Sequence, residues 1–126
     1  MRITYGKNVY GKAEIDSVVA QLKKSTQMGK SVRDFEKGVA KKFSKKYGLM
    51  VNSGSSALTL AMNVLNLSKG DEIIAPCLNF GTAISSIILC GAVPILVDVE
   101  VDTLQIDPDK IEEKITKKTK AIMVPN

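Results

Sequence analysis

Residues 51–58 read Val-Asn-Ser-Gly-Ser-Ser-Ala-Leu, and the other segments of the chain can be placed around them. A short apolar run ends here, and a turn of small residues opens a segment with helical periodicity. The first N–H groups of a helix lack intrahelical partners and lie at the positive end of its dipole, so a phosphate group is a natural ligand. Gly54 would allow close approach, and serine hydroxyls would add donors. A helix start capped by Ser53 with no bound anion explains the same residues equally well.

Strand-like and helix-like segments alternate along the chain. An amphipathic helix is predicted over 13–24, and a second helix is predicted to start at Ser31, which forms a capping pair with Asp34. The apolar residues of the second helix are Val32, Phe35, Val39, Phe43 and Tyr47. Further helices are predicted over 57–65, 80–90 and 108–115, and strands over 49–52, 72–75, 93–99 and 121–124. This order predicts an α/β fold of three layers, in which helices cover both faces of a parallel or mixed sheet and ligands bind at the carboxyl ends of strands.

Composition indicates a globular protein that is neither fibrous nor disordered. The 126 residues are 44% hydrophobic and 25% charged. No apolar run reaches the roughly 18 residues of a membrane span, and no signal-peptide pattern opens the chain, so we expect a cytoplasmic protein without membrane contact. Cys77 and Cys90 are predicted to be reduced, buried thiols. The sequence stops directly after the strand 121–124, so we expect the chain to be part of a larger domain.

The net charge of +5 raises the question of nucleic-acid binding. The lysines are spread over pairs such as Lys23-Lys24 and Lys45-Lys46, in segments whose opposite face is apolar. No aromatic residues are interleaved with them to stack on bases. We therefore interpret the lysines as solvated helix faces and expect no nucleic-acid partner.

Several segments, taken in order, resemble one known family. They are 52–57 (Asn-Ser-Gly-Ser-Ser-Ala), 69–76 (Lys-Gly-Asp-Glu-Ile-Ile-Ala-Pro), 91–94 (Gly-Ala-Val-Pro) and 97–99 (Val-Asp-Val). The chain resembles the DegT-type family of sugar aminotransferases, which are pyridoxal-phosphate (PLP) enzymes of the aspartate aminotransferase fold. The resemblance runs from about Tyr5 to Asn126. It implies that residues 1–30 are a lead-in and helix, and that residues 31–126 are the N-terminal part of a truncated PLP-binding large domain.

The resemblance also implies a cofactor site. By position, the backbone amides of Gly54, Ser55 and Ser56 would hold the PLP phosphate, and the ring of Phe80 would stack on the pyridine. Without the resemblance, Phe80 reads as a core aromatic at a helix start. Asp98 lies at the end of a predicted strand near the ligand edge, where an aspartate is more often a turn cap than a ligand.

Substrate contacts are implied for segments that match the sugar pocket of relatives. The matching residues are Tyr5, Met28 and Gly29. In the family the PLP-binding lysine lies beyond the position of Asn126, so we assign no catalytic residue in this chain.

The implied reaction is transamination of a nucleotide-linked 4-keto-6-deoxy sugar for lipopolysaccharide, O-antigen or other surface-polysaccharide biosynthesis. Glutamate is the type of amino donor expected, and a homodimer is the expected assembly. In a second branch of the family a histidine replaces the lysine and the enzyme is a CDP-4-keto-6-deoxyhexose 3-dehydratase, which local features here also resemble. A third reading, from another class, is a binding module that holds a phosphorylated ligand without catalysis.

Overall fold

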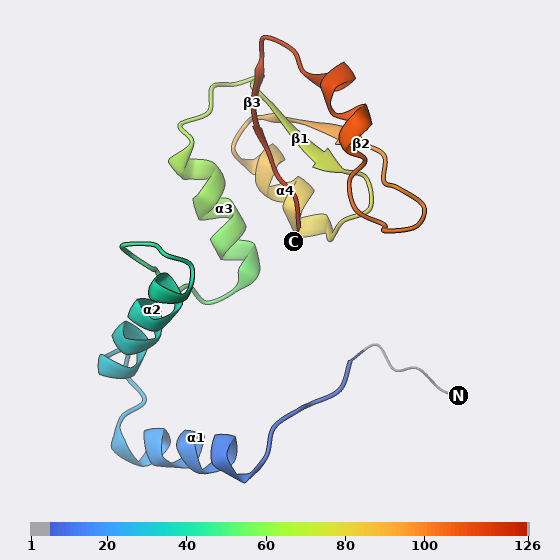
Figure 1. The fold of residues 1–126 in the computed structure, drawn as a ribbon. Coiled ribbons are helices and arrows are strands. Elements are labelled where there is room, and N and C mark those ends of the chain that lie inside the picture. The colour runs from blue at the N-terminus through green and yellow to red at the C-terminus, as the bar shows by residue number, and fades with distance from the viewer. Residues whose placement is uncertain (1–5, 126) are drawn as a thin grey trace. The chain divides into compact units, whose positions relative to one another are not determined.

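The computed structural model describes residues 6–125. The chain divides into two compact units, and the boundary in the sequence lies between Met50 and Val51. The first unit contains helices α1 (Lys12–Lys24) and α2 (Lys30–Lys42), shown in blue to green in Figure 1. The predicted helix over 13–24 is thus present. Its start is stabilised by the Glu14 carboxylate, which accepts the N–H of Gly11 at 2.7 Å.

Helix α2 starts differently from the prediction. Its N-cap is Gly29, which offers no side chain, and Ser31 lies inside the first turn. The Ser31 hydroxyl donates instead to the side-chain oxygen of Gln21 at 2.7 Å, which joins the two helices. The predicted capping role of Ser31 is therefore wrong, because its hydroxyl has a tertiary partner.

Two further predictions for the first unit are wrong. Phe43 and Tyr47 lie beyond the end of α2, and both are exposed. Residues 49–52 form no strand, because none of the described segments pairs with them. The N–H of Met50 donates to the Glu36 carboxylate at 2.8 Å, so a side chain takes the place of a strand partner.

The second unit is built on a parallel sheet. It contains α3 (Gly54–Val64), β1 (Glu72–Pro76), α4 (Gly81–Leu89), β2 (Val93–Val97) and β3 (Thr119–Ile122). The strand order is β2-β1-β3, and both pairings are parallel. Ile74 of β1 lies opposite Ile95 on one side and Ile122 on the other. Each predicted strand after residue 70 is present, within about two residues of its predicted ends.

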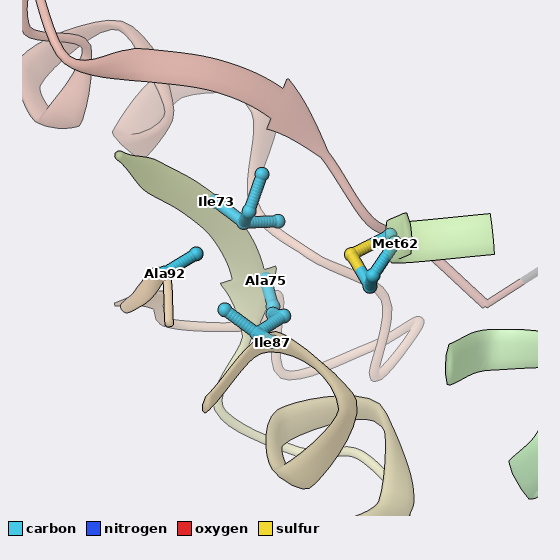
Figure 2. Close-up of a cluster of buried hydrophobic side chains, with 5 residues drawn as sticks. All are labelled: Met62, Ile73, Ala75, Ile87 and Ala92. Atoms are coloured by element: carbon cyan, nitrogen blue, oxygen red, sulfur yellow. The ribbon is translucent and has the colours of Figure 1, made fainter. Parts of the chain in front are cut away.

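The central strand β1 is buried on both faces, as is typical of parallel sheets. Ile73 and Ala75 face the helical layer, where they pack with Met62 of α3 and Ile87 of α4; Figure 2 shows these side chains directed toward one another. Ile74, the intervening residue, packs on the opposite face in a second cluster. Side chains that alternate between the faces of a strand therefore anchor both layers.

The second cluster contains Val97, Ile106 and, partly buried, Ile111. Ile111 lies between two short 3₁₀ helices, η1 (Pro108–Lys110) and η2 (Glu112–Lys114), in place of the α-helix predicted over 108–115. Backbone bonds from Lys114 to Ile111 and from Ile115 to Glu112 have 3₁₀ spacing, so the segment is tightened rather than α-helical. In Figure 1 these short helices (orange-red) and α4 lie on opposite sides of β1.

The thiols differ from the prediction in one respect. Both cysteines are free, but Cys77 is exposed and Cys90 is partly buried. Cys77 is the first residue after β1, beyond the part of the strand that the two layers cover. Within residues 6–125, no helix is both long and apolar enough to cross a membrane.

Candidate functional site

The start of α3 combines a side-chain cap with open backbone donors. Ser53, in an extended conformation, accepts the N–H of Ser56 on its hydroxyl oxygen at 3.1 Å, and its carbonyl accepts the N–H of Ala57 at 3.1 Å. Within the described chain, the amides of Gly54 and Ser55 have no hydrogen-bond partner. Capping and anion binding are thus compatible here, because the cap uses the third amide of the helix and leaves the first two open.

Space around these amides is available to a ligand. A Cβ atom at Gly54 would meet no heavy atom within 4 Å beyond its own neighbours in the chain and helix, and both Gly54 and Ser55 are exposed. The Ser53 hydroxyl lies 3.1 Å from that of Ser56, which can still turn one donor or acceptor toward a ligand. Two amides and two hydroxyls at the positive end of an eleven-residue helix suit a phosphate group.

A hollow of about 530 Å³ adjoins this turn. It lies between α3 and α4, and Ser55, Ser56 and Thr82 are among its lining residues. The complete lining is Val51, Asn52, Ser55, Ser56, Thr59, Leu60, Thr82, Ser85 and Leu89. The structure thus places two of the predicted phosphate residues beside the first turn of α4. Sequence reasoning missed the hydroxyls of Thr59, Thr82 and Ser85. The available signal was helical spacing within each helix, since Thr59 follows Ser56 by three residues and Ser85 follows Thr82 by three.

Phe80 is the N-cap residue of α4, and its side chain is 72% exposed. The alternative reading as a core aromatic is therefore wrong for this unit. The N–H of Phe80 donates to the side-chain oxygen of Asn79 at 2.7 Å, and its carbonyl accepts the N–H of Ala83 at 3.0 Å. Phe80 lies two residues before Thr82, outside the lining of the hollow. Its ring is available to stack on a planar ligand.

The predicted sugar-pocket residues lie elsewhere in the chain. Met28 is 82% exposed, and Gly29 caps α2 in the first unit. Tyr5 lies outside the described residues. Their substrate role stays a prediction.

Asp98 follows β2 at the carboxyl edge of the sheet and is exposed. One of its carboxylate oxygens accepts the N–H of Val99 at 2.9 Å and the thiol of Cys77 at 3.4 Å. Lys110 lies 3.7 Å from the other oxygen. The Val99 amide first, then the Cys77 thiol and the charge of Lys110, hold the pKa of Asp98 below its ordinary value, so it is ionised at neutral pH.

Comparisons with known proteins show the family of the chain. Residues 9–126 match the model of the DegT/DnrJ/EryC1/StrS aminotransferase family. The chain is 44% identical over 97 residues to the dTDP-3-amino-3,6-dideoxy-alpha-D-galactopyranose transaminase of Aneurinibacillus thermoaerophilus, which covers 77% of the chain and 27% of that protein. It is 40% identical over 105 residues to the GDP-4-keto-6-deoxy-D-mannose 3-dehydratase of Yersinia pseudotuberculosis, which covers 79% of the chain and 27% of that protein.

The fold of the chain is also similar to that of a solved structure. The crystal structure of a GDP-4-keto-6-deoxymannose-3-dehydratase with a trapped PLP-glutamate geminal diamine matches with a TM-score of 0.90 and 32% identity. The match covers 99% of this chain and 36% of that one. The predicted α/β fold of a PLP-dependent transferase is thereby confirmed. The chain spans roughly a quarter to a third of the length of these proteins.

Proposed function

The chain belongs to the DegT/DnrJ/EryC1/StrS aminotransferase family, and from this premise we propose that the protein is a PLP-dependent enzyme acting on a nucleotide-linked 4-keto-6-deoxy sugar. Its proposed reaction is transamination of the sugar ketone, with glutamate as amino donor, in surface-polysaccharide biosynthesis. The observation that supports this best is the start of α3, where the amides of Gly54 and Ser55 are open beside a hydroxyl-lined hollow. A homodimer in the cytoplasm is part of the same proposal.

Each residue of the proposed site has a distinct task. The amides of Gly54 and Ser55 donate to the phosphate, and the hydroxyls of Ser55 and Ser56 supply further hydrogen bonds. The Ser56 amide does not donate to the phosphate, because it already donates a hydrogen bond to the Ser53 hydroxyl oxygen. Phe80 covers one face of the cofactor ring and excludes water from it. When bound, PLP supplies the electron sink for amino-group transfer.

A matched pair of variants at Gly54 tests the phosphate site. Gly54 is the first residue of α3, where proline is well tolerated, and the extended conformation of Ser53 suits a residue that precedes proline. Gly54→Pro therefore removes one N–H donor with little cost to the helix, whereas Gly54→Ala keeps it. A charge-assisted hydrogen bond contributes roughly 1.5–3 kcal/mol, so we expect Gly54→Pro to weaken PLP binding about tenfold or more.

The readout is an absorbance titration with PLP of the complete protein, of which this chain is proposed to be the N-terminal part, alongside circular dichroism to check helix content. Gly54→Ala is expected to bind within about twofold of the unsubstituted protein, since it removes no donor. No saturable uptake of PLP by the unsubstituted protein would refute the proposed function. Equal binding by the proline and alanine variants would refute the role of the Gly54 amide alone.

The second candidate reaction is the 3-dehydratase of the same family. It is supported by the solved dehydratase that matches 99% of the chain. Incubation of the PLP-loaded protein with glutamate and a CDP-, GDP- or dTDP-linked 4-keto-6-deoxyhexose separates the candidates by mass spectrometry. An amino sugar supports transamination, and a product that has lost the 3-hydroxyl without gaining nitrogen supports dehydration. PLP binding with neither product would favour the non-catalytic binding module.

A further inference from the structure

The exposure of Phe80 raises the question of what orients its ring. With 72% of its surface exposed, the side chain receives little packing from its neighbours. Leu78, in the same loop, is 53% exposed and offers no rigid support. A stacking residue must hold its ring at a defined angle and height. Within the described residues, the contacts that can constrain Phe80 lie along the backbone of residues 77–80.

The C-terminal end of this loop is fixed locally. Asn79 accepts the N–H of Phe80 on its side-chain oxygen, and the Phe80 carbonyl accepts the first capping bond from Ala83. These bonds set the backbone of Phe80 relative to α4. These bonds do not determine how far the loop lies from the sheet. That distance depends on the contacts at the other end of the loop.

At the other end the loop is tied to β2. The N–H of Cys77 donates to the Val97 carbonyl at 2.8 Å, which continues the pairing of Pro76 with Val97 by one residue. The Cys77 thiol then donates to the Asp98 carboxylate at 3.4 Å. Cys77 is therefore held through its backbone by Val97, the last residue of β2, and through its side chain by Asp98, the residue that follows β2.

Asp98 is itself held from two directions. Its backbone carbonyl accepts the N–H of Asp107 at 3.0 Å, next to the bridge between Val99 and Ile106. The Lys110 ammonium lies 3.7 Å from the Asp98 carboxylate and 3.4 Å from that of Asp107. Asp107 also caps η1 by accepting the N–H of Asp109. The carboxylate thus connects the loop after β1 to the layer of short helices.

We infer that Asp98 is a positioning residue for Phe80, acting through Cys77 to hold the loop of residues 77–80 so that the exposed ring can lie flat against the PLP pyridine. This inference rests on the proposed function, which gives Phe80 its partner. The sequence left two alternatives for Asp98, a direct ligand or a turn cap. The inferred role differs from both, because Asp98 acts on the cofactor through Cys77 and Phe80. Asp98 is assigned no contact with PLP.

The main test compares PLP affinity and the visible circular dichroism of bound PLP in Asp98→Ala. PLP is achiral, so its dichroic band reports how firmly the protein orients the ring. We expect about tenfold weaker binding and at least a twofold smaller band per bound PLP, because the ring of Phe80 is no longer held. Asp102→Ala, at an exposed carboxylate in the loop after β2, is the control and should leave both quantities unchanged.

A double-mutant cycle separates positioning from general stability. If Asp98 acts through Phe80, the Asp98→Ala substitution should change affinity less than twofold once Phe80→Ala is present. A merely structural role would lower affinity by the same factor in both backgrounds. Additive losses in the cycle would overturn the inference.

Cys77 provides a second route if Asp98→Ala fails to fold. Cys77→Ser keeps a donor toward Asp98, whereas Cys77→Ala removes it. We expect the serine variant to retain the dichroic band and the alanine variant to lose part of it. Equal bands in these two variants, or wild-type affinity in a folded Asp98→Ala protein, would refute the inference while leaving the proposed function intact. Failure of the unsubstituted protein to bind PLP would refute the proposed function itself.

Discussion

In α1 the apolar residues Ile15, Val18 and Leu22 are each at least 50% exposed, whereas Ile73 of β1 and Ile87 of α4 are completely buried. Both regions have clear amphipathic patterns. The difference is that the strands and helices after Val51 supply partners for one another, since residues 73, 75 and 87 belong to one cluster. In the first unit, Ala40 is the single buried hydrophobic residue among residues 6–50. Periodicity thus predicts that a helix forms, but burial depends on what lies opposite.

The largest expected effect comes from the core of the second unit. Ile73→Ala removes a fully buried side chain from the cluster with Met62 and Ile87, and should lower the free energy of unfolding by about 2–5 kcal/mol. Val18→Ala in α1, at a position that is 59% exposed, should cost less than about 1 kcal/mol. Urea denaturation followed by circular dichroism measures both. Equal losses would contradict the assignment of the core to the second unit.

Two glycines should respond to alanine with opposite signs. Gly91, between α4 and β2, has φ of +79°, so Gly91→Ala should destabilise the second unit by about 1–2 kcal/mol. Gly38 lies inside α2 with open space around it, so Gly38→Ala should stabilise that helix by about 0.5–1 kcal/mol. Thermal unfolding and helix content are the measurements. A stabilising effect at Gly91 would show that the left-handed turn is not required.

The helix caps provide a smaller contrast. Ser53→Ala removes the hydroxyl that accepts the Ser56 amide and should cost about 1 kcal/mol. Ser31→Ala, at the residue whose pattern predicts a cap but which lies inside α2, should cost no more than about 0.5 kcal/mol. Comparison of the two unfolding midpoints is the test. If Ser31→Ala were the more harmful substitution, the expected order of the two effects would be wrong, and the Ser31 bond to Gln21 would be worth more than the Ser53 cap.

The smallest effects concern one carboxylate in each unit. Hydrogen bonds from Gly11 to Glu14, and from Val99 and Cys77 to Asp98, lower the pKa of both groups. Ionisation of a group with a lowered pKa stabilises the folded state. This stabilisation is complete above the ordinary pKa, which is 4.5 for Glu14 and 3.8 for Asp98. It is lost as the pH falls through the lower pKa of the folded state. The stability difference between the unsubstituted protein and Glu14→Gln or Asp98→Asn should therefore be present at pH 7 and vanish in acid. A difference that grew in acid would contradict these directions.

Local patterns were sufficient for most of the fold. The spacing of apolar residues predicted helices α1, α3 and α4, and short apolar runs predicted the three strands of the described chain. Each element is long enough for its pattern to be recognised in the sequence. The segment over 108–115 was predicted as one helix but forms two 3₁₀ turns, and Ile111 between them packs against the cluster around Ile74. Residues 49–52 have the composition of a strand but not its structure, since a strand requires a hydrogen-bonding neighbour that composition does not reveal.

For the candidate site, the sequence by itself determined the turn that we propose as the phosphate site, with Ser53 as the cap and Gly54 as the first residue of α3. The role of Phe80 was predicted from the family resemblance. Only the tertiary structure decided that Thr82 lines the same hollow as Ser55, and that Asp98 is bonded to Cys77. The physical reason is distance along the chain. A cap is formed by residues three apart and can be read from local pattern, whereas residues 77 and 98 meet only because β1 and β2 pair in parallel and end at the same edge.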